Sequence, residues 1–344
     1  MSDSMTENEG PRFAIEVAGE TLNQAEPKGV TSFFVEDHVD MMGVLKVTIS
    51  QTGLEWSTIK MGDPATASFG GNADKVFNGL ITGLRHHQHK GGMEYVTIIA
   101  MDPLCKLGSS RHTKVYEEQS DSDIVSAVLG AAGVSAGTVD STSGTNKYVI
   151  QRNESDLMFL KRLAARNGYL LLGDKDGKVE FTKAQFSGSP IELAREDLIE
   201  FDYTVSHQTI PPSLTVYGWS YVDKKKVEGT ASSGDVDTIG GGKNAVKETG
   251  VIWQDDAYVS DVQVADQGAA KAMAIAELNR LARQFVRGRA KVKGTGEIHA
   301  GVLVKFKSFA TGFNPEGFVI ASRHVVENGM YTTEFQFVSS TSPQ

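Results

Sequence analysis

The sequence has 344 residues, of which 40% are hydrophobic, and it carries 34 Lys and Arg against 43 Asp and Glu. This length predicts two or three domains with a buried core. The formal net charge of −9 argues against a nucleic-acid-binding protein, because neutralising phosphates takes a clustered basic face. A single cysteine excludes an internal disulfide and any four-sulfur metal site.

No apolar run approaches the roughly 18 to 20 residues that a membrane-spanning helix needs. The N-terminal residues 1–10 are polar and acidic, so we expect them to be disordered, and they lack the basic start and apolar stretch of a signal peptide. We therefore expect assembly in the cytoplasm. The 36 glycines, against nine prolines, favour a strand-rich protein with many turns.

Residues 11–104 predict a first β-barrel. Phe13–Val17 and Leu45–Ile49 alternate apolar and polar residues, as half-buried strands do. The apolar runs 76–83 and 95–100 flank a polar stretch, which indicates a long hairpin that closes the barrel.

Residues 105–200 predict a mixed α+β unit. Ser120 or Ser122 can cap a helix that ends near Gly133, and Ser155 can cap a second helix that ends at Gly168. A strand hairpin is then expected. The residues that carry these patterns are Ile124, Val125, Val128 and Leu129 in the first helix, Phe159, Leu160, Leu163 and Ala164 in the second, and runs 169–172 and 179–181 in the hairpin.

Residues 201–344 predict a second β-barrel. Its polar, glycine-rich segment 229–250 reads as an exposed, mobile loop that would order only against a partner. A long helix is expected at 264–287, with a buried face at Ile275, Leu278, Ala282 and Phe285. No internal repeat is visible. The predicted strands are 199–203, 214–221, 290–293, 302–306, 317–322 and 331–338.

Two glycine-rich motifs are incomplete as nucleotide sites. Gly240 to Lys243 lacks the glycine and the hydroxyl of a phosphate loop, since Asp237 and Asn244 occupy those places. The turn at Gly294 and Gly296 lacks the third glycine of a dinucleotide-binding turn. We therefore expect no bound cofactor.

The residues with metal or thiol chemistry also have ordinary structural readings. His86, His87 and His89 lie close together, but adjacent strand residues point to opposite faces, so only His87 and His89 could share an ion. We expect the tip of a hairpin and no metal site. Cys105 lies between apolar residues and reads as a small core residue.

Nothing in the sequence marks an enzyme, and no catalytic residue is predicted. The carboxylates are too numerous for one pair to be selected, and the nucleophile-elbow and zinc-protease motifs are absent. Trp56, Trp219 and Trp253 are too scattered for a stacking platform and read as core or interface anchors.

Tyr148–Leu172 resembles the most recognisable segment of the VgrG spike proteins and of phage late control protein D. The other landmarks of that family occur in the same order along residues 70–340. They are the runs 77–81 and 102–104, Arg111, the run 122–125, the run 216–219 and the closing stretch 329–337.

The resemblance implies the baseplate hub of a contractile injection system, such as a phage tail, a pyocin or an extracellular particle. Members of the family are homotrimers in which each chain supplies two similar barrels, so that a pseudo-sixfold ring docks the hexameric inner tube. Baseplate wedge proteins are further expected partners. Because the sequence stops at Gln344, after the second barrel, we expect the threefold spike to be a separate polypeptide.

Two other classes remain open at this stage, and the resemblance assigns no interface residues. A peptidoglycan- or polysaccharide-active enzyme on a β scaffold would place paired carboxylates in a deep cleft. A carbohydrate-binding module would stay monomeric and expose an aromatic platform.

Overall fold

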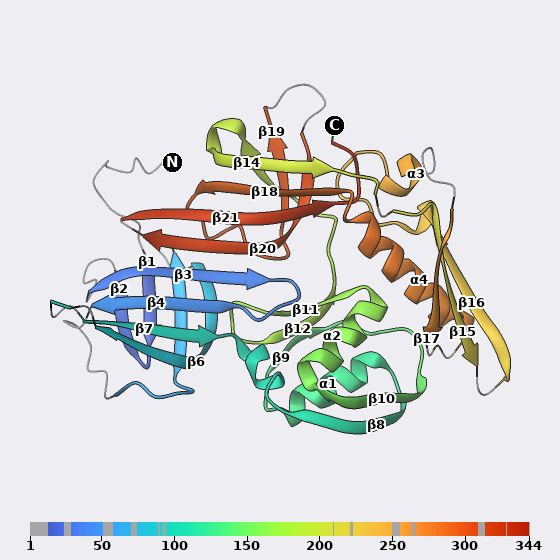
Figure 1. Cartoon of the computed structure of the whole chain (residues 1–344), viewed down its shortest axis with the longest axis horizontal. Helices are drawn as coiled ribbons and strands as arrows, with labels where there is room; N and C mark the ends of the chain where they lie inside the picture. The colour runs from blue at the N-terminus through green and yellow to red at the C-terminus, as the bar shows by residue number, and fades with distance from the viewer. Residues whose placement is uncertain are drawn as a thin grey trace.

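Figure 1 shows the computed structural model of the chain, which describes residues 13–23, 29–50, 58–69, 74–88, 90–91, 94–208, 210–220, 223–249, 255–262, 264, 266–308, 314–327 and 329–343. Residues 1–10, which we expect to be disordered, lie outside the described residues. Among the described residues, no helix is long and apolar enough to cross a membrane.

One large, mainly antiparallel sheet runs through both strand-rich ends of the chain. It has 13 strands, in the order β14-β18-β21-β20-β3-β4-β7-β6-β5-β1-β2, and β13 and β19 extend it beside β20. The strands are β1 Phe13–Val17, β2 Glu20–Asn23, β3 Val30–His38, β4 Val44–Ser50, β5 Pro64–Phe69, β6 Asp74–Gln88, β7 Glu94–Met101, β13 Ile191–Ala194, β14 Leu198–Val205, β18 Val286–Lys293, β19 Leu303–Lys307, β20 Glu316–Glu327 and β21 Met330–Ser339.

The two halves of this sheet have the same strand order. The first module is β3-β4-β7-β6, and the second module is β14-β18-β21-β20. In each module the last two strands along the chain form a hairpin, and the later strand of that hairpin lies next to the module's second strand. In each module the strand before that hairpin, β5 or β19, pairs with the start of its first strand. The prediction of a mainly β fold with two similar barrel domains is confirmed.

Irregularities in the pairing fall at matching places in the two modules. A bulge follows Val30 on β3 and Leu198 on β14, and a second follows Ile81 on β6 and Val319 on β20. Bulges bend a strand and fix its register, so the modules match residue for residue. This repeat lies in the register of the strands.

The core face of the sheet follows from strict alternation along the strands. In β4 the residues Leu45, Val47 and Ile49 are buried while their neighbours are half-buried, as expected when one face packs and the other stays polar. The first core also contains Phe33, Val35, Phe69, Phe77, Ile81, Ile98 and Ala100.

The middle of the chain forms a separate small core. Helix α1 (Asp121–Ala131) starts with a capping box at Ser120, and α2 (Asp156–Asn167) starts at Ser155 and ends at Gly168, whose φ of 69° is left-handed. Both predicted helices and the predicted hairpin are confirmed. The other elements are η2 Pro103–Leu107, β8 Arg111–Gln119, β9 Ala136–Val139, β10 Asn146–Ser155, β11 Tyr169–Gly173 and β12 Val179–Lys183.

An insertion separates the first two strands of the second module. It holds the three-stranded sheet β16-β15-β17 and the helices α3 and α4, at the right of Figure 1. The first module has only a short turn at the same place. The elements are β15 Ser213–Ser220, β16 Lys225–Ser232, η4 Ser233–Asp235, α3 Ala245–Thr249, β17 Ala257–Val262 and α4 Gln267–Ala282.

The long helix is shorter than the predicted 264–287. Asp266 caps its N-terminus by accepting the Ala269 N–H, and residues from Val286 onward leave the helix because they pair with β14 and β21. The predicted buried face is correct for Leu278, Ala282 and Phe285, and Ile275 is half-buried.

Helix α4 packs against the three-stranded sheet, and not across the barrel as expected. Its apolar residues share a core with Leu214, Val216 and Ala231. At Gly229 of β16 an added Cβ would collide with the backbone of Lys271, so this close approach requires glycine.

The segment 229–250 is not the exposed loop that its composition suggests. Val236, Ile239, Ala245 and Val246 are buried, and the segment bonds to the end of β21, where the Ala245 N–H donates to the Ser340 carbonyl at 2.9 Å. A few well-placed apolar residues therefore suffice to dock it. Gly250 lies outside the described residues.

The boundaries between the predicted middle unit and the two strand-rich units are less distinct in the structure than in the sequence. β13, within the range expected for the middle unit, pairs in parallel with β19 of the large sheet. Leu104 and Leu107 of η2 belong to the core of the middle unit.

Candidate functional site

The two modules meet edge to edge where β3 pairs with β20. The register joins Ala321 to His38 at one end and Glu327 to Ser32 at the other. In Figure 1 the two strands run side by side and join the two layers of strands into one surface. This strand pair, the module junction, is the feature that makes the sheet continuous.

The core side of the module junction holds a buried polar cluster. Asp37 accepts the Ala300 N–H at 2.8 Å and the Ser322 hydroxyl. His324 is 1% exposed, and its Nδ1 lies 3.0 Å from the Tyr331 hydroxyl. Burial lowers the pKa of His324 to about 4, against the opposing influence of Asp37, so the imidazole is neutral at physiological pH.

The opposite face of the sheet carries a row of charges in cross-strand register. Glu200 on β14 lies opposite Lys291 on β18, which lies opposite Glu334 on β21. Glu334 lies opposite Arg323 on β20, and Arg323 lies opposite Glu36 on β3. The signs alternate along this charge ladder across five neighbouring strands.

The contacts within the charge ladder are direct. Lys291 Nζ lies 2.9 Å from Glu334 Oε1, and Arg323 Nε lies 3.1 Å from Glu36 Oε1. The hydrogen bond that Lys291 donates to Glu334 raises the pKa of Lys291. Cross-strand pairs of opposite charge stabilise a register, so the ladder holds the two modules in one alignment.

A cleft of about 330 Å³ lies where both modules and the middle unit converge. It brings together carboxylates that the sequence did not single out, from β3, the N-cap of η2 and the β11–β12 hairpin. They are Asp37, Asp102, Asp174, Asp176 and Glu180.

Three of these carboxylates are committed to backbone contacts. Asp102 accepts the N–H groups of Gly43 at 2.6 Å and Leu104 at 2.9 Å, and Asp174 accepts those of two residues in its own turn. Asp37 belongs to the junction cluster. Burial raises the pKa of Asp102 to about 6, although its backbone hydrogen bonds oppose the shift.

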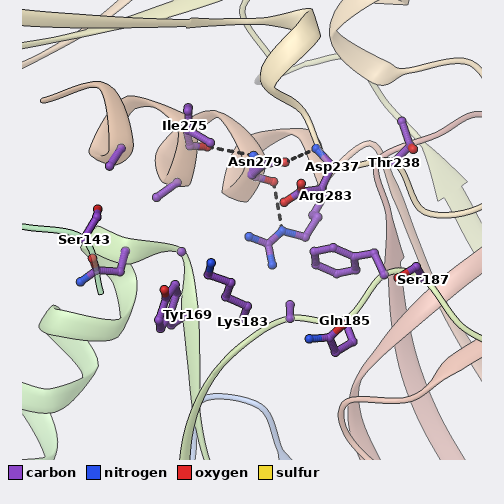
Figure 2. A pocket seen from close by; sticks show the side chains of 16 residues that line it. Ser143, Tyr169, Lys183, Gln185, Ser187, Asp237, Thr238, Ile275, Asn279 and Arg283 are labelled. Carbon is purple, nitrogen blue, oxygen red and sulfur yellow. Dashed lines mark hydrogen bonds between the residues drawn. The ribbon is translucent and has the colours of Figure 1, made fainter. Parts of the chain in front are cut away.

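A second pocket, of about 590 Å³, lies between the middle unit and α4 (Figure 2). Arg283 extends into it from the end of α4, with its guanidinium 5.3 Å from the centre of the Phe186 ring. Burial lowers the pKa of Arg283, and Asp237 and Asp40 oppose that shift. Its lining contains one carboxylate, Asp237, together with the cationic side chains of Lys183 and Arg283.

The outer face of the three-stranded sheet exposes aromatic rings. Trp219 is 47% exposed and Tyr258 is 61% exposed, and the Tyr258 ring stacks on Tyr217 at 5.7 Å between centroids. Trp219 is therefore not a core residue. Trp56 and Trp253 lie outside the described residues.

His86 and His87 lie at the end of β6, close to the turn that leads into β7. His86 Nε2 lies 3.5 Å from Glu94, and His89 is outside the described residues. Over the described part of the chain, no group of three or more His, Cys, Asp or Glu side chains is placed to hold a metal ion.

The other residues considered from the sequence have structural roles. Cys105 is half-buried in η2, and burial raises the pKa of its thiol, so it is less of a core residue than expected. Gly240 to Lys243 packs against the end of the chain, where the Lys243 N–H donates to the Ser342 hydroxyl.

The fold is shared with tail proteins of bacteriophages and with components of related machines. The 43 kDa tail protein of prophage MuSo2 from Shewanella oneidensis superposes with a TM-score of 0.72 at 14% identity, covering 96% of this chain and 98% of that one. An E. coli protein described as a type VI secretion component similar to the T4 tail proteins gp27 and gp5 gives 0.60 at 13% identity, covering 96% and 79%.

A chain of a Francisella PdpA–VgrG complex gives a TM-score of 0.58 at 9% identity, covering 99% of this chain and 60% of that one. The resemblance to the tail and VgrG proteins is thus confirmed at the level of the fold. No curated protein sequence matches the chain. The chain belongs to the family of the Alg8 N-terminal domain, whose model matches residues 57–328.

Proposed function

We propose that the protein is the structural baseplate hub of a contractile injection system and acts as a homotrimer. Three chains with two modules each form a pseudo-sixfold ring that docks the hexameric inner tube on one side and a threefold spike on the other. Wedge proteins of the baseplate surround this ring. The protein performs no catalysis in this role.

The observation that carries this proposal is the repeat of one module within the chain. A threefold object can match a sixfold tube only if each chain offers two equivalent docking surfaces. The modules β3-β4-β7-β6 and β14-β18-β21-β20 share their strand order and the positions of their bulges. They are also joined edge to edge, as neighbours in a ring of like modules would be.

The charge ladder supports an assignment of the two faces of the sheet. The apolar face packs the core, and the polar face, with the charge ladder, would line the central channel. A channel wall of alternating charges stays hydrated and presents no extended apolar surface to which passing cargo would adhere.

Co-expression with the inner-tube protein of the same gene cluster tests the proposal. Native mass spectrometry should show three copies of this chain, and electron microscopy should show the ring capping the end of a tube. A single copy in the tube-bound complex would contradict the hub.

The carboxylate cleft favours one alternative, an enzyme that acts on peptidoglycan or another polysaccharide. Two carboxyl groups with raised pKa, Asp102 and Glu180, line it. Incubation with purified cell walls, with the Asp102→Asn and Glu180→Gln variants beside the parent, decides between the two. The hub predicts no released saccharide in any sample, whereas turnover that both variants abolish would establish the enzyme.

A further inference from the structure

The pocket of Figure 2 lies between two parts of the chain that are far apart in the sequence. One wall belongs to the middle unit and includes Gly168 at the end of α2, and the other is α4 with the loop around Asp237. The two walls touch at Gly168, where an added Cβ would lie 3.3 Å from the Ala276 side chain. Ala272 and Ala276 line the pocket beside this contact, so the α4 wall is made of small side chains there.

Arg283 is held in one orientation at the end of α4. It is the C-cap residue of the helix, and its Nε donates to the Asn279 carbonyl at 3.1 Å. Its guanidinium lies 5.3 Å from the centre of the Phe186 ring. A guanidinium with its Nε bonded and one face on an aromatic ring has its two Nη groups left for further hydrogen bonds. Figure 2 shows that end of the side chain pointing into the pocket.

The two Nη groups of Arg283 have no hydrogen-bond acceptor within the part of the chain that the structure describes. Asp237 and Asp40 influence the pKa of Arg283 through their charge, but neither forms an ion pair with it. Burial lowers that pKa, because the charged form loses hydration in the pocket. A preoriented guanidinium with a free pair of donors has the geometry that binds an oxyanion in a bidentate manner.

The charge of the lining favours a ligand group with a single negative charge. Two cations, Lys183 and Arg283, face one carboxylate, Asp237, which leaves one net positive charge. Lys183 is exposed, with its Nζ 5.7 Å from the centre of the Tyr169 ring, so it adds its charge at the rim. A carboxylate matches this balance. A phosphate group, with a charge of about −1.5 to −2, would be repelled more strongly by Asp237.

The pocket is larger than a carboxylate alone would need. Its volume of about 590 Å³ falls within the roughly 300 to 1,000 Å³ of small-molecule sites. Further hydroxyl and amide side chains line it and make no hydrogen bond to other described residues, so they are available to a ligand. They are Ser143, Gln185, Ser187 and Thr238. The lining therefore suits an organic molecule that carries a carboxylate and other polar groups.

We propose that this pocket binds a carboxylate group, which the two Nη groups of Arg283 hold in a bidentate arrangement while Lys183 adds positive charge at the rim. The carboxylate belongs to a small organic acid or to an acidic side chain of a peptide. Both sources present the same chemistry to the arginine. The site lies outside the two modules of the large sheet, so it does not depend on the proposed hub.

Isothermal titration calorimetry of the full chain at constant ionic strength tests the site. The probes are N-acetylglycine as a free organic acid, a capped glycine–glutamate–glycine tripeptide, and the same tripeptide with glutamine as its neutral counterpart. The glutamate peptide should bind at least about tenfold more tightly than the glutamine peptide, because only a carboxylate forms charge-assisted bonds with Arg283. Tighter binding of N-acetylglycine than of the glutamate peptide identifies a free acid as the source, and the reverse order identifies a peptide.

Three variants assign the binding to these residues. Arg283→Gln should weaken the carboxylate probes by at least about tenfold, and Arg283→Lys, which keeps the charge but loses the fork, by a smaller factor. Asp237→Asn should instead strengthen them several-fold, because it removes a like charge from the lining. Misfolding cannot produce a gain in affinity, so this variant keeps the test decisive if the arginine variants fail to fold. Arg287→Gln, at an exposed arginine of β18 outside the lining, is the matched control and should change nothing.

Three results would overturn the proposal. One is the absence of binding by either carboxylate probe at its highest soluble concentration, or binding that Arg283→Gln leaves unchanged. Another is tighter binding of inorganic phosphate than of both carboxylate probes. The third is an equal loss of stability in Asp237→Asn and Arg283→Gln without any change in affinity, since Arg283 would then serve only as the counter-ion of Asp237. None of these results bears on the number of chains in the tube-bound complex, which tests the hub separately.

Discussion

Among the described residues, the same strand edge is covered in one module and open in the other. Along β20 the edge is covered by β3, and its residues are Ser322, buried in a polar cluster, and Arg323, paired with Glu36. Along β6 the residues at the same places after the matching bulge are Leu84 and Arg85, both exposed. The two modules therefore repeat the same backbone register. Their side chains at this edge differ, because a neighbouring strand covers the edge of β20 and none of the described strands covers that of β6.

This difference teaches where the two halves must agree and where they are free to differ. Strand order and bulges must agree, because they set the curvature and the docking surface. Side chains need only suit their own neighbours. One module closes its turn after His38 in a few residues, and the other inserts a whole sheet and helix at the same place.

The largest effect should come from disrupting the packing of α4, which belongs to the insertion in the second module. Leu278→Asp places an unpaired carboxylate at a fully buried position of α4 and should cost about 4 kcal/mol of unfolding free energy. Arg280→Ala, at an exposed site on the same helix, should change it by less than about 0.5 kcal/mol. Urea titration measures both, and equal effects would show that this helix face does not pack.

The free energy of unfolding should depend on pH through His324, which lies at the module junction. Its folded-state pKa of about 4 lies below the ordinary 6.5, so its contribution is present above pH 6.5 and is lost as the pH falls toward 4. That loss should reach as much as about 3 kcal/mol. Asp102, with its pKa raised to about 6, acts in the opposite direction, since its protonated form is favoured in the folded state.

Urea midpoints of the parent and the His324→Asn variant at pH 6.5 and 4.5 isolate the histidine, because Asp102 is common to both. The parent should lose more stability than the variant over this interval. Equal losses would contradict a neutral, buried His324.

Two glycines at equivalent positions of the two modules should both be intolerant of a larger side chain, because the backbone is equally crowded there. An added Cβ would meet the Met101 carbonyl at Gly79 and the Phe337 ring at Gly317, which occupy equivalent positions. Each Gly→Ala change should cost about 2 kcal/mol. Gly130→Ala, in open space on α1, should instead stabilise by up to about 1 kcal/mol, and thermal unfolding ranks all three.

The smallest expected effect concerns the arginine at the covered edge of β20, compared with the arginine at the open edge of β6. Arg323→Ala removes the ion pair with Glu36 and the contact with the Phe34 ring at 4.7 Å, and should cost about 1 kcal/mol in the isolated chain. Arg85→Ala should cost nothing measurable there. An equal cost for the two variants in the isolated chain would contradict this difference between the covered and the open edge.

Much of the fold could be predicted from local patterns. Alternation located strands such as Leu45–Ile49, and the caps at Ser120 and Ser155 located both middle helices. The end of α4 was missed because Phe285 continues the helical spacing, while strand pairing decides the conformation from Val286 onward.

The candidate site could not be predicted because it depends on strands far apart in the sequence. Arg323 and Glu36 become neighbours only once β20 pairs with β3. The repeat escaped detection because register, and not residue identity, is conserved between the modules. The local traces are the matched glycines Gly79 and Gly317 and the pair Arg-His, which occurs at residues 85–86 and again at 323–324 at equivalent places.

The most direct test of the central claim is a cryo-electron microscopy map of the chain bound to its inner tube. The two modules should superpose by a rotation of about a sixth of a turn around the threefold axis, with both contacting the tube in the same way. Modules that face the tube with different surfaces, or a rotation far from that value, would contradict the hub as a symmetry adapter.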